Sequence, residues 1–438
     1  MNVLDIEPCL VHVDRNRFQL SCRLIIFFLV NSVSSPLFRP IALGLYLLFF
    51  TAGVVGALVL PTFSLFLASE IGVRPLLVGL AFAGIALASI AYNHWLGHWS
   101  DKLVDRRPLV IFCCLLGTLA CVIFALSRNY WLVAFTAIFL LSLSMVSFSQ
   151  IMAYSLDYAE SEIPVERIPM FNAIMRAQIA FAWVAGPPAG FLLATYFGFD
   201  VSYGIAAALY VLVALASFKL LPRLPKKNKP VTASGDQHFL PPLSPTIKQS
   251  LWLCAIAFSL LWGVNNAYLI SLPIHLKDNL QMDAQWMGWV MGTTAALEVP
   301  FMLLAGHYAS RFRLISLIRC AGIAALLLYV GVYFASELWQ LFVLQICNAI
   351  FIGVLAGLGV SVIQDLMPGR SGGASALYTN TTHVGNLLSS LMVGLVADYY
   401  GYHQVFLANI LLVLIAIWVF GKVKTSRDLA RKNPDEVT

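Results

Sequence analysis

The sequence predicts an all-α membrane protein with twelve transmembrane helices arranged as two six-helix pseudo-repeats. Hydrophobic residues make up 60% of its 438 residues. Charged residues make up only 11%, whereas they make up roughly 25% of an ordinary soluble protein. Apolar runs recur along almost the whole chain, and the two halves share sequence at a constant offset. Soluble, disordered and disulfide-stapled chains are excluded because none of these classes carries so much apolar sequence.

Twelve apolar stretches are each long enough to cross the roughly 30 Å hydrocarbon layer as a helix. In the first half of the chain they are 41–67, 75–99, 108–127, 130–155, 168–196 and 200–221. In the second half they are 249–275, 284–308, 314–335, 338–364, 372–398 and 402–422. We expect two bundles, 39–221 and 249–423, joined by a cytoplasmic linker at 222–248 that is rich in Pro, Lys and polar residues. Residues 1–38 form an N-terminal extension of unassigned role, and residues 424–438 form a cytoplasmic tail.

The positions of the basic residues support this count of spans. With both termini cytoplasmic, only Arg74, Arg128 and Lys277 fall in outer loops. Arg176 and Arg319 fall inside spans, and all other Lys and Arg residues lie on cytoplasmic segments or helix ends. This asymmetry is typical of membrane proteins, and an odd number of spans would remove it. The net charge of +6 therefore reflects topology and does not indicate a nucleic-acid partner.

No pattern predicts a metal, a cofactor or an enzyme. The eight cysteines form no spaced CxxC pair, so neither a zinc site nor a disulfide framework is indicated. His94 and His383 stand singly within apolar spans. The sequence has no P-loop for ATP and no nucleophile–base set. We therefore expect no metal, no cofactor and no enzymatic activity.

The two halves match at equivalent spans. The segment Gly97-His-Trp-Ser-Asp-Lys102 ends the second span, and Gly306-His-Tyr-Ala-Ser-Arg311 ends the eighth span, 209 positions later. Gly79 and Gly288 are related by the same offset. Parallel repeats of this kind are typical of secondary transporters, whose substrate site lies between the halves near the membrane midplane.

The stretch Gly97-x-x-x-Asp101-Lys102, followed by Arg106 and Arg107, resembles the signature loop of the major facilitator superfamily. Further blocks are similar to the bacterial Set-type sugar efflux transporters; they include Phe112–Gly117, Ala182–Pro188, Leu297–Pro300, Asn348–Gly353, Gln364–Gly369 and Leu377–Thr381. The resemblance covers nearly all of 41–422. It implies the major facilitator fold and export of sugars or glycosides across the bacterial inner membrane by proton exchange. It also implies that Gly97, Asp101 and Arg106 act in gating; the alternative is an ordinary solvated cytoplasmic loop rich in basic residues.

Two charges lie deep in spans that this resemblance places side by side. Arg176 lies eight residues after the cytoplasmic start of span five, and Glu298 lies eight residues before the cytoplasmic end of span eight. At about 1.5 Å per residue, both lie about 12 Å inside the membrane. A charge in the membrane costs at least about 2.5–3.5 kcal/mol at mid-bilayer, so it marks a functional candidate. We expect the two side chains to interact, with Glu298 binding the coupling proton or a sugar hydroxyl; the alternative is a static ion pair that fixes helix register.

A sugar site needs amides that match hydroxyl groups and an aromatic face for the C–H surface of the ring. Residues of these kinds gather in four spans, mostly in the second half. The candidates are Trp262, Asn265, Asn266 and Tyr268 in span seven, Asn348 in span ten, Tyr378 and Asn380 in span eleven, and Gln178 and Trp183 in span five. The alternative is that these side chains only join helix to helix through hydrogen bonds.

Span five also carries Gly186-Pro187-Pro188-Ala189-Gly190, which resembles part of the glycine–proline signature of superfamily antiporters. The tandem prolines remove two backbone donors and should bend the helix. We therefore assign Gly186 and Pro187 to gating, with an ordinary kink as the alternative. Asp365, at the cytoplasmic end of span ten, is a further gating candidate, and simple solvation of a helix end is its alternative.

Together these features predict a secondary active exporter of sugars or glycosides that exchanges them for protons by alternating access. We expect a monomer in the bacterial inner membrane, with the lipid bilayer, protons and a small sugar as its partners. An exporter of drugs or other metabolites on the same scaffold is the closest alternative. An apolar aromatic cavity would favour a drug, and an amide-rich cavity a sugar. A non-transporting membrane sensor is a more distant alternative.

Overall fold

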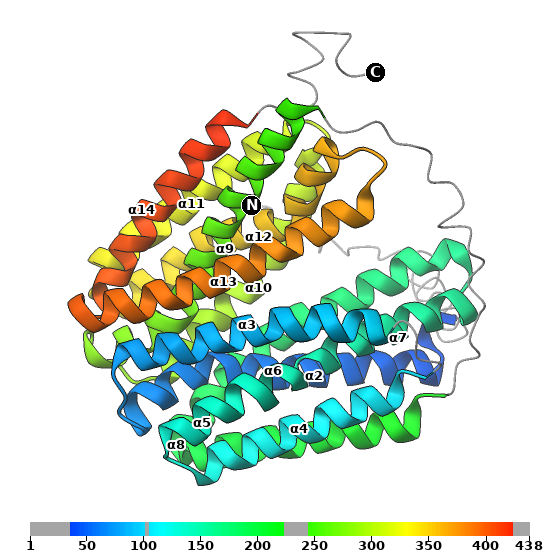
Figure 1. Ribbon diagram of the computed structural model, residues 1–438, viewed down its shortest axis with the longest axis horizontal. Helices are drawn as coiled ribbons and strands as arrows, with labels where there is room; N and C mark the ends of the chain where they lie inside the picture. Colours follow the sequence, from blue (N-terminus) through cyan, green and yellow to red (C-terminus); the bar gives the residue numbers. More distant parts are fainter. Residues whose placement is uncertain (1–35, 101–104, 223–243, 424–438) are drawn as a thin grey trace, which may run out of the picture.

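The computed structural model describes residues 36–100, 105–222 and 244–423. These residues form α-helices with short 3₁₀ and π segments, and no β-strand occurs among them. Figure 1 shows two groups of helices, one from the first half of the chain (blue to green) and one from the second half (green to red). The predicted all-α membrane architecture is confirmed.

The α-helices alternate with short connections in both halves. In the first half they are α2 (Pro40–Leu65), α3 (Pro75–Ser100), α4 (Arg107–Leu126), α5 (Tyr130–Thr136), α6 (Ser142–Ser144), α7 (Val146–Glu162) and α8 (Ile168–Leu220). In the second half they are α9 (Pro245–Asp278), α10 (Gln285–Ala309), α11 (Leu314–Phe334), α12 (Leu338–Leu366), α13 (Ser371–Tyr400) and α14 (Tyr402–Lys422). The π segments η2 (Phe66–Glu70) and η3 (Ala137–Leu141) continue α2 and α5, and the 3₁₀ turns η1 (Pro36–Phe38) and η4 (Val165–Arg167) precede α2 and α8.

Among the described residues, ten helical segments are long and apolar enough to cross a membrane. One of them includes α8, whose 53 residues would measure about 80 Å if straight. Gly198, at φ +85° and ψ 165°, divides α8 into two arms, 168–197 and 199–220. The 30-residue α13 carries many polar side chains and is not one of the ten. With the two arms of α8 taken separately and α13 included, helices stand at the positions of all twelve predicted spans.

The sequence explains where several helices begin. Proline stands in the first turn of α2, α4, α8 and α9, where its missing N–H loses no intrahelical hydrogen bond. The Asn129 side chain accepts hydrogen bonds from the backbone N–H groups of Trp131 and Leu132 at the start of α5. Glu337 and Gln340 form a capping box at the start of α12. These caps satisfy N–H groups that would otherwise lack partners at the helix ends.

The backbone of α8 departs from helical geometry at Gly198 rather than at the prolines. The helix continues through Pro187 and Pro188, and Gly198 is the residue within it whose backbone angles are not helical. Glycine populates positive φ without a steric penalty, so it turns the chain back at this point. Gly186 has a packing role: a Cβ atom there would lie only 2.5 Å from the Cβ of Ala57 on α2.

We call the end where α8 finishes and α9 begins the linker end, and the opposite end the distal end. The two halves meet mainly along α3 with α13 and α8 with α10, and α2 also contacts α9. In Figure 1 the halves lie close together where α3 begins and α13 ends, and they diverge from there. The halves therefore pack together at the distal end and separate toward the linker end.

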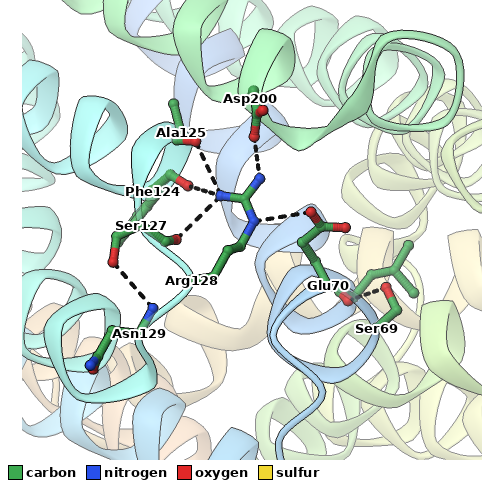
Figure 2. A network of polar contacts seen from close by, with 9 residues as sticks. Ser69, Glu70, Phe124, Ala125, Ser127, Arg128, Asn129 and Asp200 are labelled. Atoms are coloured by element: carbon green, nitrogen blue, oxygen red, sulfur yellow. Dashed lines mark hydrogen bonds and ion pairs between the residues drawn. The ribbon is translucent and has the colours of Figure 1, made fainter.

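Arg128, in the loop between α4 and α5, holds the distal end of the first half together (Figure 2). Its Nε donates to Glu70 Oε1 (3.0 Å), and its Nη2 donates to Asp200 Oδ1. Its Nη1 donates to backbone carbonyls at the end of α4, those of Phe124, Ala125 and Ser127. One guanidinium thus joins the ends of α2 and α4 to the second arm of α8 and satisfies carbonyls that a helix end leaves unpaired.

We expect Arg128→Gln to destabilise the detergent-solubilised protein. Hydrogen bonds to charged groups contribute about 1.5–3 kcal/mol each, and partial solvent exposure of the three side chains lowers the expected loss to about 1–2 kcal/mol in total. The measurement is the thermal melting temperature. Lys277→Gln is the matched control, because it removes an exposed cation from the same end. Equal melting temperatures for the two variants would contradict the assigned role.

Candidate functional site

A network of buried polar side chains lies inside the second half, between α9, α10 and α12. The hydroxyl groups of Tyr268 and Thr294 both donate to Gln345 Oε1, at 3.1 Å and 2.6 Å. Asn348 Nδ2 donates to the same oxygen at 3.1 Å and lies 3.4 Å from Thr294 Oγ1. All four side chains belong to residues that are more than nine-tenths buried. Buried polar groups are costly unless they are paired, so this network fixes how the three helices pack.

Seven buried polar side-chain atoms of the second half lack a partner among the described residues, and two of them, Trp262 Nε1 and Asn348 Oδ1, belong to predicted sugar ligands. The Trp262 ring stands edge-on to the Tyr378 ring, with centroids 6.3 Å apart. The Tyr378 hydroxyl is itself paired, because it donates to Leu355 O of α12 (2.6 Å). These two predicted ligands therefore hold one unsatisfied donor and one unsatisfied acceptor, the two kinds of group that a sugar hydroxyl pairs with.

Glu298 lies on α10 one turn beyond Thr294, on the same side of the helix and toward the linker end. Its side chain is half-buried. Its backbone oxygen lies against α12, where a Cβ atom at Gly353 would be 2.9 Å away. Arg176 on α8 is exposed, and no ion pair described within the structure joins it to Glu298. The predicted pair is not formed in this arrangement, in which the halves diverge toward the linker end.

Other predicted sugar ligands make contacts away from this network. Asn266 Nδ2 bridges α9 to α13 by donating to Asn386 O, Ser389 Oγ and Ser390 Oγ. Gln178 Nε2 donates to Ile174 O of its own helix at 3.4 Å. These contacts match the alternative in which polar side chains join or brace helices. Asn265 and Trp183 are half-buried, and their sugar contacts remain predictions.

Asn380 lies on a different side of α13 from Tyr378. Residues two apart in an α-helix point about 200° apart, so they do not share a face. Tyr378 is directed at α12, whereas Asn380 lines an outer groove between α9, α13 and α14. The structure therefore does not bring these two predicted ligands into one cavity.

Small residues close the distal end between the halves. A Cβ atom at Gly79 of α3 would lie 2.4 Å from Gly394 Cα of α13. A Cβ atom at Gly288 of α10 would lie 2.6 Å from Pro188 Cα and 2.7 Å from Pro187 O of α8. Because Gly79 and Gly288 are the repeat-related glycines, equivalent positions of the two halves make the closest approaches.

An ion pair accompanies this closure. Arg74, before α3, donates from Nη2 to Oδ2 of Asp398, near the end of α13 (2.6 Å), and from Nε to Oδ1 (3.3 Å). The backbone N–H of Leu76 also donates to Asp398 Oδ1 (3.4 Å). The Asp398 side chain is 8% exposed, while that of Arg74 is 73% exposed. This pair links the first half directly to the second.

Arg106 connects elements at the linker end of the first half. Its Nε donates to Asp157 Oδ2 (3.2 Å), and its Nη1 donates to Ser100 Oγ (3.0 Å) and Gln150 Oε1 (3.1 Å). These bonds tie the loop after α3 to α7. The predicted gating residue Arg106 thus braces the first half internally in this structure.

The structure gives less information about the other gating candidates at the linker end. Gly97 lies within α3, and Asp101 lies outside the described residues. Asp365 and Arg313 line the same small cavity, of about 90 Å³, near the ends of α11 and α12. Their roles in gating remain predictions.

Three residues of this arrangement were not candidates from the sequence. Thr294 precedes Glu298 by one helical turn, a spacing that the sequence does contain. Arg74 and Asp398 are 324 positions apart, and nothing in the sequence of either segment indicates that they meet.

The family model described as Major Facilitator Superfamily matches residues 45–337 and 251–437. Sugar efflux transporter A of Dickeya chrysanthemi is 41% identical over 82% of this chain and 90% of its own length. Sugar efflux transporter B of Salmonella typhimurium is 37% identical over 86% and 93%. Sugar efflux transporter C of Escherichia coli K12 is 36% identical over 83% and 91%.

Solved structures agree on the fold. The nucleoside transporter NupG superposes with a TM-score of 0.72 at 16% identity, over 88% of this chain and 99% of its own. An inward-facing, occupied bacterial homologue of the lysosomal transporter Spinster gives 0.71 at 13% identity, over 90% and 97%. At these identities the likeness concerns the fold alone. By its sequence match and its two-bundle architecture, the chain belongs to the Major Facilitator Superfamily, and within it resembles the sugar efflux transporters.

Proposed function

We propose that this protein exports sugars or glycosides across the bacterial inner membrane in exchange for protons. The observation that carries the proposal is its identity of 35–41% with proteins named sugar efflux transporters, over at least 82% of the chain. The amide-rich network of the second half supports a polar substrate rather than an apolar one. No second function has a comparable observation in its favour.

The network supplies the chemistry that a sugar requires. Asn348 offers an unpaired acceptor, and Trp262 offers an unpaired donor together with an aromatic ring. Sugar hydroxyls that leave water for a buried site must recover their hydrogen bonds, and each of these two atoms would provide one. The ordered bonds around Gln345 would hold Asn348 in place before the substrate arrives.

Glu298 is our choice for the proton-carrying group. It lies one turn from the substrate network, on the helix that contacts the first half at Gly288. Loss of the proton leaves the Glu298 side chain charged, and apolar surroundings disfavour a charge. The protonated and the charged forms of Glu298 therefore favour different degrees of exposure to water. Binding and release of a proton there would bias the halves between two arrangements, which is the requirement for exchange.

Alternating access follows if the two halves rock around this site. The structure is closed at the distal end and diverges toward the linker end. The excess of Lys and Arg on the linker side makes the linker end cytoplasmic, with both termini on that side. We therefore assign the arrangement to an inward-facing state of a monomer.

The first test is flux into inside-out vesicles under an imposed proton gradient, with labelled lactose, glucose and arabinose. Wild-type protein should accumulate at least one of these sugars when the vesicle interior is acidic. Glu298→Gln keeps the size of the side chain but does not titrate, so gradient-driven accumulation should fall to the level of empty vesicles. Facilitated equilibration of the sugar should persist in the variant. If sugar accumulation in Glu298→Gln depended on the proton gradient as it does in wild type, Glu298 would have no role in carrying the proton. Flux of a drug without flux of any sugar would make drugs, rather than sugars, the substrate class.

A second prediction concerns Asn348. Asn348→Leu removes an acceptor for one sugar hydroxyl, and a lost hydrogen bond of about 1–1.5 kcal/mol should raise the transport KM about tenfold. Asn409→Leu is the matched control, because Asn409 is also a buried amide with one unpaired oxygen but lies on α14 and donates to a backbone carbonyl, that of Val264, rather than to a side chain of the network. KM values that rise equally in both variants would contradict a binding role for Asn348.

A third prediction concerns distal closure. Gly79→Val places side-chain atoms against Gly394, so the distal end should no longer close. Spin labels at the exposed Phe197 and Tyr400, one on each half, should then show longer distances by pulsed electron paramagnetic resonance. Gly204→Val is the control, because a Cβ atom there meets nothing within 4 Å. A folded Gly79→Val protein with the control's distance distribution would refute the assigned closure.

A further inference from the structure

A groove on the outer side of the second half has no part in the proposed transport site. It lies between α9, α13 and α14 and has a volume of about 560 Å³. Small-molecule sites generally measure about 300–1,000 Å³. In Figure 1, α13 and α14 meet at one end and diverge, with α9 between them. The groove therefore opens where α13 and α14 separate, with the third helix, α9, between them.

The floor of the groove is formed by close packing of α9 on α13. A Cβ atom at Gly385 would lie 2.4 Å from Ser259 O and 2.9 Å from Gly263 N. Because the two helices touch here, Ser259 and Gly385 define one common depth. Both helices start at the linker end, so residues before these two lie nearer to that end.

The lining changes character along this axis. Trp252 lies seven residues before Ser259 and is 72% exposed, which places it about 10 Å nearer to the linker end. Asn380 lies five residues before Gly385, about 7–8 Å nearer to that end, and is exposed. Beyond the contact, in the distal direction, the lining is mostly apolar and includes Leu388 and Met392. The hydroxyl of Ser389, which also lines this part, is already paired with Asn266 and Asn386.

A cationic residue completes the polar mouth. Lys248 is exposed and lies four residues before Trp252, one turn nearer to the linker end on the same side of α9. Tryptophan favours the depth of lipid headgroups, and a lysine at that level attracts anionic lipid. The amide of Asn380 lines the groove about 3 Å deeper than Trp252, toward the level at which the ester groups of a lipid lie.

From this gradient we propose that the groove is a binding site for an anionic phospholipid of the linker-side leaflet. The acyl chain would lie along α9 between α13 and α14. The phosphate would face Lys248 and Trp252, and the Asn380 amide would donate to an ester carbonyl. The site is separate from the proposed sugar network, and its occupation requires no transport.

The test is native mass spectrometry of purified protein with phosphatidylglycerol or phosphatidylcholine added at equal concentration. Wild-type protein should retain phosphatidylglycerol more strongly. Lys248→Gln should lower its apparent affinity about fivefold, the effect of about one lysine beside an anionic surface, and should leave phosphatidylcholine unchanged. Asn380→Leu should weaken both lipids, because the ester group is common to them.

A filling variant tests the position of the acyl chain. Val384→Trp places a large side chain at the exposed wall of the groove and should reduce retention of both lipids. Leu327→Trp is its control, because Leu327 is also exposed but lies on α11, outside the groove. Lipid adducts that are identical in wild type, Lys248→Gln and Asn380→Leu would overturn the proposal even if Val384→Trp did not fold. Equal loss in Val384→Trp and Leu327→Trp would also overturn it.

Discussion

The absence of water from a bilayer interior is the constraint on which the remaining structure depends. Every polar side chain between the helix ends must find a partner in the protein, or stand where a ligand, lipid or water supplies one. The Gln345 oxygen meets this requirement for three neighbours at once, by accepting from Tyr268, Thr294 and Asn348. The helices α9, α10 and α12 are thereby held in one register. A polar atom that stays unpaired in such surroundings is therefore informative.

The same surroundings explain why the contact between the halves is made by glycine and proline. Apolar side chains gain little by leaving lipid for protein, so helices associate through close backbone approach. Gly79 against Gly394 and Gly288 against Pro187 and Pro188 provide such approaches at equivalent places of the repeat. The Arg74–Asp398 pair adds a polar contact at the rim of this surface, where water is available to both groups once the contact opens.

Apolar runs and charge placement were sufficient to predict the spans, because a membrane span is a local property of the sequence; the repeat and the family resemblance supplied the two-bundle fold. Gly79 and Gly288, which share the repeat offset, lie where the halves approach, although the sequence alone did not predict that contact. Side-chain partners were harder, because they depend on rotation about the helix axis. Tyr378 and Asn380 are close in sequence and were therefore predicted to act together, yet residues two positions apart on a helix face different directions. Arg74 and Asp398 meet only through the complete fold, and Arg176 and Glu298 lie where the halves have diverged.

One helix links the separate parts of the proposed mechanism. Gly288, Thr294 and Glu298 follow one another along α10, and Gly288 and Glu298 are about 15 Å apart at 1.5 Å per residue. Gly288 touches the prolines of the first half, Thr294 belongs to the substrate network, and Glu298 carries the titratable group. In the proposed mechanism, a shift of this helix that accommodates a charge at Glu298 would be transmitted to the contact at Gly288. Close packing at Gly353 and at Pro188 holds both ends of the segment, and packed contacts of this kind favour discrete arrangements over continuous ones, which the proposed exchange would require.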